Sequence, residues 1–321
     1  MDRVGHGRRG GGRGPAEAGA VSPDPTGESP SLDRASDGAR SGGRPGLTPW
    51  GNRASDEAPA LLGNWLSMVE GRLSRCWHLT LCLDFDGTLA PIVADPEAAA
   101  MPADVERALR ALADRPRVDP AVVSGRALSD LRERIDPDVT LAGNHGLEIA
   151  RGDSEWVHPG AAERREALER AMADVAERLA SYPDCRVADK GATATVHHRG
   201  ADAGHATVRA AVDAAVADEP GLVATDGRKV VEVRPDVDHD KGDAVRELVD
   251  DRQSEAAVYV GDDVTDEDAF AALDELACES MGVLVGRRRS AADYRVHDVD
   301  GVRAFLEWLD DAAVPATGGG R

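Results

Sequence analysis

Short runs of aliphatic and β-branched residues recur along the chain, and each run ends in a polar turn. The runs at 79–84, 118–124 and 139–143 alternate with segments whose apolar residues repeat at helical spacing, at 102–114 and 127–135. Short runs that are apolar throughout are typical of strands buried on both faces. The alternation therefore predicts half of an α/β fold on a parallel sheet.

The second half of this sheet is expected near the end of the chain. Two more apolar runs, at 256–260 and 282–285, flank a helix beginning near Asp266. We also expect an amphipathic helix at 58–75, before the first strand, and another at 301–312.

Between these halves the pattern changes to helix–strand–strand–helix–strand–strand. The predicted elements are 160–181, 185–188, 192–198, 203–218, 222–225 and 229–234. The last two strands are joined by Asp226-Gly227-Arg228, a good hairpin turn. This order predicts a separate α+β domain inserted into the first.

The predicted elements divide the chain into four parts. They are a tail at 1–53, a core at 54–148 and 236–313, an inserted domain at 149–235, and a flexible tail at 314–321. The first 53 residues are rich in Gly, Arg, Ser, Pro and Asp and lack hydrophobic periodicity. They have too little apolar surface to offset the entropy of ordering, so we expect them to be disordered.

The charge balance restricts the partners. The formal net charge is −21, with three lysines and 35 arginines against 59 acids. So acidic a protein repels nucleic acids and anionic membranes, and we expect neither as a partner. The scarcity of lysine beside many acids favours a halophile's protein, whose self-repulsion salt would screen. An ordinary acidic mesophilic protein is the alternative.

Cysteine usage and hydropathy predict the compartment. No C-x-x-C pair is present, which indicates reduced thiols rather than disulfides. No apolar stretch reaches the length of a membrane span, and no apolar run follows the N-terminal arginines as in a secretory signal. We expect a cytoplasmic protein, and a monomer.

The most informative segment is Asp84-Phe85-Asp86-Gly87-Thr88, directly after the first strand. Two acids two residues apart face opposite ways on a straight strand, so this pair lies where the strand opens into a loop. That is the end at which α/β sheets bind ligands. One carboxylate there can attack phosphorus or hold a cation while the other handles protons. A plain Asp-Gly turn is the alternative.

Three further segments favour a catalytic site over a turn. They are Ser124-Gly125-Arg126, Asp240-Lys241-Gly242 and the acid-rich run 261–268. Ser124 and Lys241 are expected to hold phosphoryl oxygens, one by a neutral hydrogen bond and one by charge. Asp262 and Asp266 are expected to hold a metal ion. For the acids of this run, the alternative is a solvated helix N-terminus.

These motifs, in this order, resemble the haloacid dehalogenase superfamily of phosphotransferases. Four segments are similar to motifs of the trehalose-6-phosphate phosphatase family: DFDGTLAPI, VSGR, AGNHG and GDDVTDEDAF. The resemblance extends over roughly residues 78–309. The resemblance implies a Rossmann-like parallel-sheet core with an inserted, mobile cap of αββαββ type. It also implies Mg²⁺-dependent hydrolysis of a small-molecule sugar phosphate, trehalose 6-phosphate, in trehalose biosynthesis.

The resemblance also implies roles for individual residues. Asp84 is the nucleophile that forms an aspartyl-phosphate. Asp86 protonates the leaving oxygen and then serves as base for the hydrolytic water. Mg²⁺ is held by Asp84, the backbone carbonyl of Asp86, Asp262 and Asp266, which are hard oxygen ligands.

Substrate contacts are expected from both domains. The candidates are Arg126, Asn144 and His145 in the core, and Lys190, Arg199, Glu232 and Arg234 in the cap. Two alternatives stay open: Arg126 pairs with a neighbouring acid, and His145 is a packed hinge residue. The family commonly has a tyrosine where His198 stands, which affects the sugar contacts rather than the chemistry.

Two other functions fit the same residues. A phosphatase of another sugar phosphate, of the sucrose or mannosylglycerate phosphate type, would share the core and differ in the cap. A catalytically silent regulatory domain that binds sugar phosphates could lose Asp84, Asp86 or Asp262 without penalty, and all three are present.

Overall fold

The computed structural model describes residues 58–136, 138–227 and 229–313. The expectations for the tails at 1–53 and 314–321, and for Arg228 in the predicted hairpin turn, lie outside these residues. Within the described part of the chain, the strands form one nine-stranded and one four-stranded sheet.

The larger sheet has the order β1-β13-β12-β11-β2-β3-β4-β5-β6. Its strands are β1 (Ala60–Leu61), β2 (Leu79–Leu83), β3 (Val118–Val123), β4 (Thr140–Gly143), β5 (Glu148–Arg151), β6 (Ser154–Val157), β11 (Ala256–Gly261), β12 (Glu279–Val285) and β13 (Tyr294–Val296). The first seven strands in this spatial order, from β1 through β13 to β4, are all parallel to their neighbours. β5 and β6 add an antiparallel edge.

The register of the central strands positions the site. On β2, Leu83 pairs with Val122 of β3 on one side and with Val260 of β11 on the other. Three parallel strands thus end at nearly the same level, and the loops that follow them open at one edge of the sheet. Every residue of β2 and β11 is buried, because helices cover both faces.

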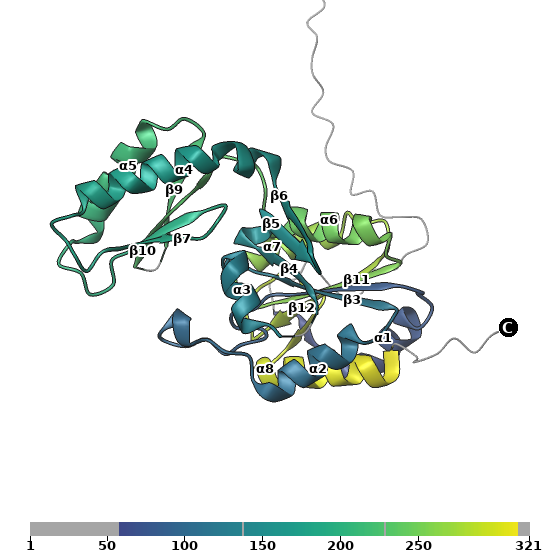
Figure 1. The fold of residues 1–321 in the computed structure, drawn as a ribbon. Helices are drawn as coiled ribbons and strands as arrows, with labels where there is room; N and C mark the ends of the chain where they lie inside the picture. The colour runs from purple at the N-terminus through teal and green to yellow at the C-terminus, as the bar shows by residue number, and fades with distance from the viewer. Residues whose placement is uncertain (1–57, 137, 228, 314–321) are drawn as a thin grey trace, which may run out of the picture. The chain divides into compact units, whose positions relative to one another are not determined.

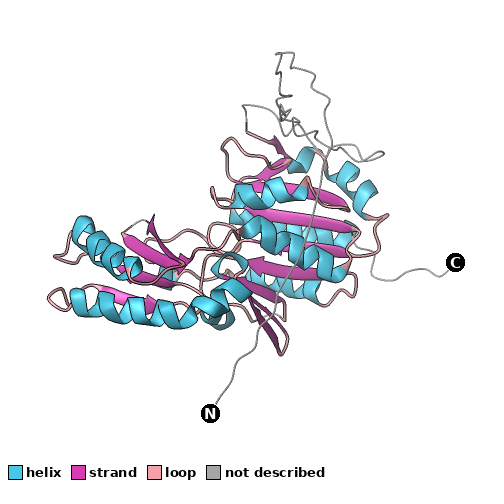
Figure 2. Cartoon of the chain, turned by 90° about the horizontal axis from the view of Figure 1, so that it is seen from above, coloured by secondary structure: helices cyan, strands magenta, loops and turns pink. Residues whose placement is uncertain are grey.

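Two groups of helices cover this sheet (Figures 1 and 2). One face packs against α1 (Leu66–Leu73), α2 (Ala103–Ala113), α3 (Leu128–Arg134) and α8 (Val299–Trp308), whose apolar side chains share one core cluster with the strands. The other face packs against α6 (Lys241–Arg252) and α7 (Asp266–Leu273) through a second cluster. Three-residue helical turns, η1 (Leu62–Asn64), η2 (Pro96–Ala98) and η3 (Asn144–Gly146), and a π-helical turn at Leu309–Ala313 complete the larger layer.

The smaller sheet is antiparallel, in the order β7-β8-β10-β9. Its strands are β7 (Arg186–Asp189), β8 (Ala194–His197), β9 (Leu222–Gly227) and β10 (Val230–Pro235), and its helices are α4 (Pro159–Arg178) and α5 (His205–Ala217). The helices lie over one face of this sheet (Figure 1). They bury a core of their own, centred on Val175, Val208 and Val231. We call residues 159–235 the cap.

The α/β class, the parallel core sheet and the αββαββ order of the insertion are confirmed. The predicted helix at 58–75 was wrong in its first half, because Ala60–Leu61 pair with β13 and the helix begins at Leu66. Trp65, directly before this helix, is 44% exposed. The two sheets also divide after residue 157 rather than at 149, because β5 and β6 hydrogen-bond to the larger sheet.

None of the helices in the described residues combines the length and apolarity that crossing a bilayer requires.

Candidate active site

The loop after β2 carries Asp84 in a buried position. The Asp84 amide donates to the carbonyl of Val260 at 2.9 Å, so the backbone still follows the sheet there. Gly87 then turns the chain, with φ at +83°, and a Cβ on it would lie 2.2 Å from an oxygen of Asp262. Because both the conformation and the space exclude a side chain, glycine is what lets this loop lie against Asp262.

Lys241 joins two buried carboxylates. Its Nζ lies 2.8 Å from Asp84 Oδ1 and 2.7 Å from Asp266 Oδ1. Lys241 is the first residue of α6, and a capping box between Asp240 and Asp243 begins this helix. The box satisfies backbone donors at the helix start and so fixes where the lysine side chain originates.

Asp266 is fully buried and held from several sides. The Tyr259 hydroxyl donates to its Oδ1 at 2.6 Å, and the Asp263 amide donates to its Oδ2 at 2.8 Å. With Lys241, these contacts leave the carboxylate little freedom. Asp266 is therefore a fixed part of the site and not a solvated helix end.

The acids at this edge fit a divalent cation. Asp84, Asp262 and Asp266 each place a carboxylate oxygen within 4.8 Å of the others. Among the described residues, Asp262 Oδ1 is buried without a hydrogen-bond partner. An unpartnered buried carboxylate oxygen is unfavourable, and a bound cation would satisfy it. Hard oxygen donors of this kind suit Mg²⁺.

Burial sets the proton affinity of these groups. Loss of hydration raises the pKa of Asp84 to about 7, even though the Lys241 charge acts in the opposite direction. Burial, and then the Asp266 charge, raise the pKa of Asp262 to about 7. Burial disfavours the charged form of Lys241, but Asp84 and Asp266 outweigh it and raise the pKa of the lysine. Such perturbed groups at one sheet edge are typical of a functional site.

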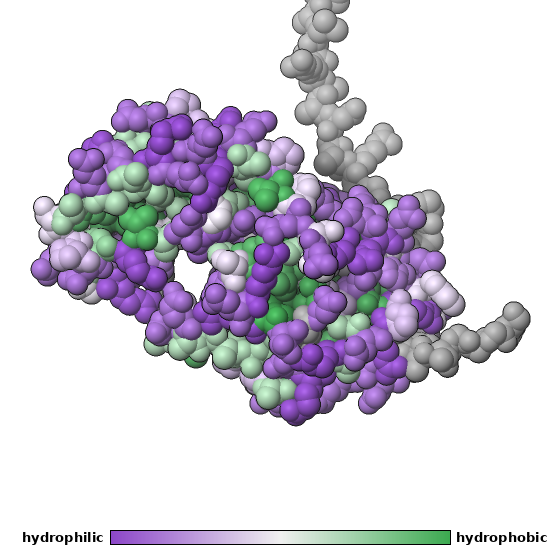
Figure 3. All heavy atoms as spheres, viewed as in Figure 1, coloured by the Kyte–Doolittle hydropathy of each residue, from purple (hydrophilic) through white to green (hydrophobic). Residues whose placement is uncertain are grey.

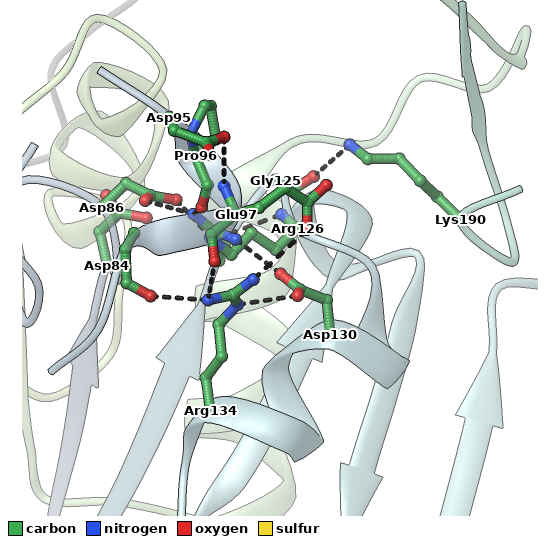
Figure 4. A network of polar contacts seen from close by, with 12 residues as sticks. Asp84, Asp86, Asp95, Pro96, Glu97, Gly125, Arg126, Asp130, Arg134 and Lys190 are labelled. Carbon is green, nitrogen blue, oxygen red and sulfur yellow. Dashed lines mark hydrogen bonds and ion pairs between the residues drawn. The ribbon is translucent and has the colours of Figure 1, made fainter. Parts of the chain in front are cut away.

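Asp86 lies beside this cluster and is bound by Arg126 (Figure 4). Nε of Arg126 lies 2.7 Å from Asp86 Oδ2, and Nη2 lies 2.7 Å from Oδ1, a two-point contact. Arg126 thus pairs with an acid, and a contact between Arg126 and the substrate phosphate stays a prediction. A metal contact through the backbone carbonyl of Asp86 stays a prediction.

Ser124 and His145 pack together where β3 ends. Ser124 is buried, and its carbonyl accepts from the His145 amide at 2.9 Å. A Cβ on Gly125 would lie 2.7 Å from the imidazole, so glycine admits this ring. Burial, with the nearby positive charge of Lys241, lowers the pKa of His145 to about 4. The ring is therefore neutral and packed against Gly125, and a contact between His145 and substrate stays a prediction.

Asn144 connects this edge with the cap. Its Nδ2 donates to the Lys190 carbonyl at 2.6 Å, and its Oδ1 accepts from the Thr193 hydroxyl at 2.8 Å. The Lys190 ammonium donates to the carbonyl of Gly125 at 3.0 Å and lies 3.7 Å from Glu232. The structure thus brings Lys190 and Glu232 together with the core residues.

The other two cap candidates have different surroundings. Arg199 is exposed and donates to the carbonyl of Ala94 at 2.6 Å. Arg234 lies on β10, partly exposed, and is near enough to His145 for its charge to help lower the pKa of the histidine.

Sequence reasoning missed several residues that the structure places here. Tyr259 and Thr193 resemble ordinary strand and turn residues, and no local pattern distinguishes them. Asp130 was detectable, because it follows Arg126 by four residues at a helix start, a spacing at which opposite charges meet.

The sequence model of the trehalose-phosphatase family matches residues 82–300. A trehalose-phosphate phosphatase of Mycobacterium marinum is 40% identical over 197 residues, which cover 59% of this chain and 50% of that protein. One of Mycobacterium avium is 34% identical over 268 residues, which cover 80% of this chain and 66% of that protein.

A solved structure shares the fold. The C-terminal domain of Candida albicans trehalose-6-phosphate phosphatase aligns with a TM-score of 0.62 at 24% identity, covering 80% of this chain and 99% of that one. The chain spans about half the length of the M. marinum relative.

Proposed function

The chain belongs to the trehalose-phosphatase family, and from this we propose that it hydrolyses trehalose 6-phosphate to trehalose and inorganic phosphate in trehalose biosynthesis. The observation that carries the proposal is the buried pair of Asp84 and Lys241 beside Asp262 and Asp266. A carboxylate nucleophile, a fixed cation and further acids at one sheet edge form a residue set suited to phosphoryl transfer.

In the proposed reaction, Asp84 attacks phosphorus and forms an aspartyl-phosphate while the bond to the sugar oxygen breaks. Asp86 gives that oxygen a proton. Asp86 then takes a proton from the water that attacks the same phosphorus, and inorganic phosphate leaves as the Asp84 carboxylate is restored. Lys241 offers positive charge, and the Ser124 hydroxyl a hydrogen bond, to the phosphoryl oxygens.

We propose Mg²⁺ as the cofactor, held by Asp84, Asp262, Asp266 and the backbone carbonyl of Asp86. When bound, it would supply the charge that lets an anionic nucleophile approach an anionic phosphate. The unpartnered buried oxygen of Asp262 supports this assignment.

For the sugar we propose contacts from the cap, chiefly from Lys190 and Glu232. Their proximity to each other and to Asn144 supports them. The full proposed set for substrate is Arg126, Asn144, His145, Lys190, Arg199, Glu232 and Arg234. A site built to hydrogen-bond sugar hydroxyls rejects analogues that lack them.

The proposed setting is the cytoplasm, with a monomer that has neither nucleic acid nor membrane as partner. The net charge of −21 and the four free cysteines support it.

Phosphate release from a panel of sugar phosphates tests the function. We expect trehalose 6-phosphate to have the highest kcat/KM with Mg²⁺ present, and EDTA to abolish turnover. Asp84→Asn should be inactive at an unchanged melting temperature, because the amide is nearly isosteric but does not attack phosphorus. A preference for sucrose 6-phosphate or mannosylglycerate phosphate would replace the substrate, and an active Asp84→Asn protein would contradict the covalent route.

A further inference from the structure

Arg126 is fixed on three sides. Besides the two bonds to Asp86, its Nη1 donates to Asp130 Oδ2 at 2.7 Å and its Nη2 donates to the carbonyl of Pro96 at 2.8 Å. A guanidinium has five N–H donors, and these contacts use four of them. The side chain is 11% exposed. Arg126 is therefore held by its neighbours in the orientation that grips Asp86.

Asp130, in the first turn of α3, stands between Arg126, which precedes the helix, and Arg134, its last residue. Its Oδ2 accepts from Arg126, and its Oδ1 accepts from Arg134 Nε at 2.7 Å. Arg126, Asp130 and Arg134 follow one another at intervals of four residues, which brings their side chains together. The carboxylate binds both guanidiniums, and its charge offsets the repulsion between them.

The segment 94–99, which contains η2, closes the other side of this cluster (Figure 4). Its Pro96 carbonyl accepts from Arg126. Arg134 Nη1 donates to the carbonyls of Ala99 at 2.6 Å and Glu97 at 3.1 Å. Both arginines thus donate to backbone carbonyls of one short segment, and Asp130 binds both guanidiniums between them.

We propose that Asp130 is a positioning residue for Asp86 and acts through Arg126. Asp86 projects from a loop and is 43% exposed, so packing alone does not orient its carboxyl group. The two-point contact with Arg126 orients it, and Asp130 orients Arg126. The inference rests on the proposed function, in which Asp86 is the acid and base.

The nature of the leaving group separates positioning from a purely structural role. A sugar oxygen leaves with difficulty unless it receives a proton, whereas p-nitrophenolate leaves as a stable anion. A displaced Asp86 should therefore slow hydrolysis of a sugar phosphate much more than that of p-nitrophenyl phosphate. General damage to α3 should slow both substrates alike.

Asp130→Asn is the direct test, because it keeps the shape and removes the charge shared by two arginines. We expect kcat for trehalose 6-phosphate to fall roughly 5- to 50-fold with little change in KM, since small displacements of a catalytic group have effects of this size. Turnover of p-nitrophenyl phosphate should change less than about two-fold. Arg134→Gln should show the same pattern with a smaller loss.

The matched control is Asp213→Asn on α5. Asp213 also accepts from an arginine four residues earlier, Arg209, at 2.8 Å, and it has no part in the proposed machinery. We expect this variant to keep both activities. The ratio of the two kcat values, measured at a melting temperature close to that of the wild type, is the readout.

Equal losses on both substrates, or no loss on either, would overturn the positioning role. If Asp130→Asn does not fold, the ratio measured for Arg134→Gln decides in the same way. If the wild type prefers another sugar phosphate, only the proposed substrate is wrong. The positioning role of Asp130 is then tested by measuring the ratio with that sugar phosphate. A wild type that hydrolyses no phosphate ester overturns both proposals.

Discussion

Asp84 and Asp262 are acids whose carboxyl groups lose much of their hydration when the protein folds. The pKa of each is raised to about 7 chiefly by burial, although Asp84 has a lysine at 2.8 Å. In the unfolded chain these carboxyls would titrate near their ordinary values, about 4. Between pH 4 and 7 the folded protein therefore binds more protons than the unfolded chain. Their contribution to the free energy of unfolding falls as pH rises through this window.

A bound cation should reverse this trend. Mg²⁺ requires ionised carboxylates, so its effect on stability should grow as Asp84 and Asp262 lose their protons. We predict that the increase in melting temperature on replacing EDTA by Mg²⁺ is larger at pH 8 than at pH 6, as measured by thermal denaturation. Asp262→Asn should lose this increase and, in EDTA at pH 8, melt no lower than the wild type. An unchanged response to Mg²⁺ in Asp262→Asn would remove this residue from the metal site.

The identities of Asp84, Lys241 and Asp262 as candidate residues followed from the sequence, because each stands at a strand or helix boundary marked by glycine. The contacts that hold the side chains of the site in place did not follow from the sequence. Arg126 has acids in reach from two segments far apart in sequence, Asp86 and Asp130, and only the three-dimensional path of the chain shows that it holds both. Tyr259 looks like any strand tyrosine until α7 brings Asp266 beneath its hydroxyl.

At the scale of elements, apolar runs located the central buried strands well, and the exposed or very short strands towards the two edges of the sheet poorly. β2 and β11 are apolar because both faces are covered. β6 is mostly exposed, so its residues lack the pattern of a buried strand. β1 and β13 have two and three residues, too few for any periodicity. Such strands exist because a neighbouring strand offers an edge, which is tertiary information.

The cap elements should determine the choice of sugar. Lys190 follows β7 and Glu232 lies on β10, next to each other. We predict that Lys190→Ala and Glu232→Ala lower kcat/KM for trehalose 6-phosphate by roughly ten-fold or more, as lost contacts to hydroxyls would. Hydrolysis of p-nitrophenyl phosphate, which lacks the sugar, should change much less.

A second lysine of the cap serves as control for this prediction. Lys229 is exposed, and its φ of +66° is one that asparagine tolerates, so Lys229→Asn should keep both activities. Equal losses on the sugar and aryl substrates in Lys190→Ala or Glu232→Ala would show that these residues support the core site and do not read the sugar.

At the scale of the whole molecule, charge dominates. Hydrophilic residues cover most of the face drawn in Figure 3. The first 53 residues hold eight arginines and six acids, so the rest of the chain carries −23. Many arginines there pair with acids at the surface, as Arg170 does with Glu219 and Arg303 with Glu307. Such exposed pairs contribute little each, and the unpaired acids repel one another.

This self-repulsion predicts a dependence on salt. The Debye length falls from about 10 Å at 0.1 M to about 3 Å at 1 M, so molar salt screens most pairs of surface acids from each other. We predict that the melting temperature rises with KCl over this range by roughly 5 °C or more, as a gain of about 2 kcal/mol in the free energy of unfolding would produce for a domain of this size. The titration is run in EDTA, so that no divalent cation at Asp262 contributes. In a separate assay with Mg²⁺ present, a halophile's protein should also gain activity over the same range. A melting temperature that stays level from 0.1 M to 1 M would instead mean that the surface arginines already balance the acids locally, and the excess of acid would then indicate nothing about the salt in which the protein works.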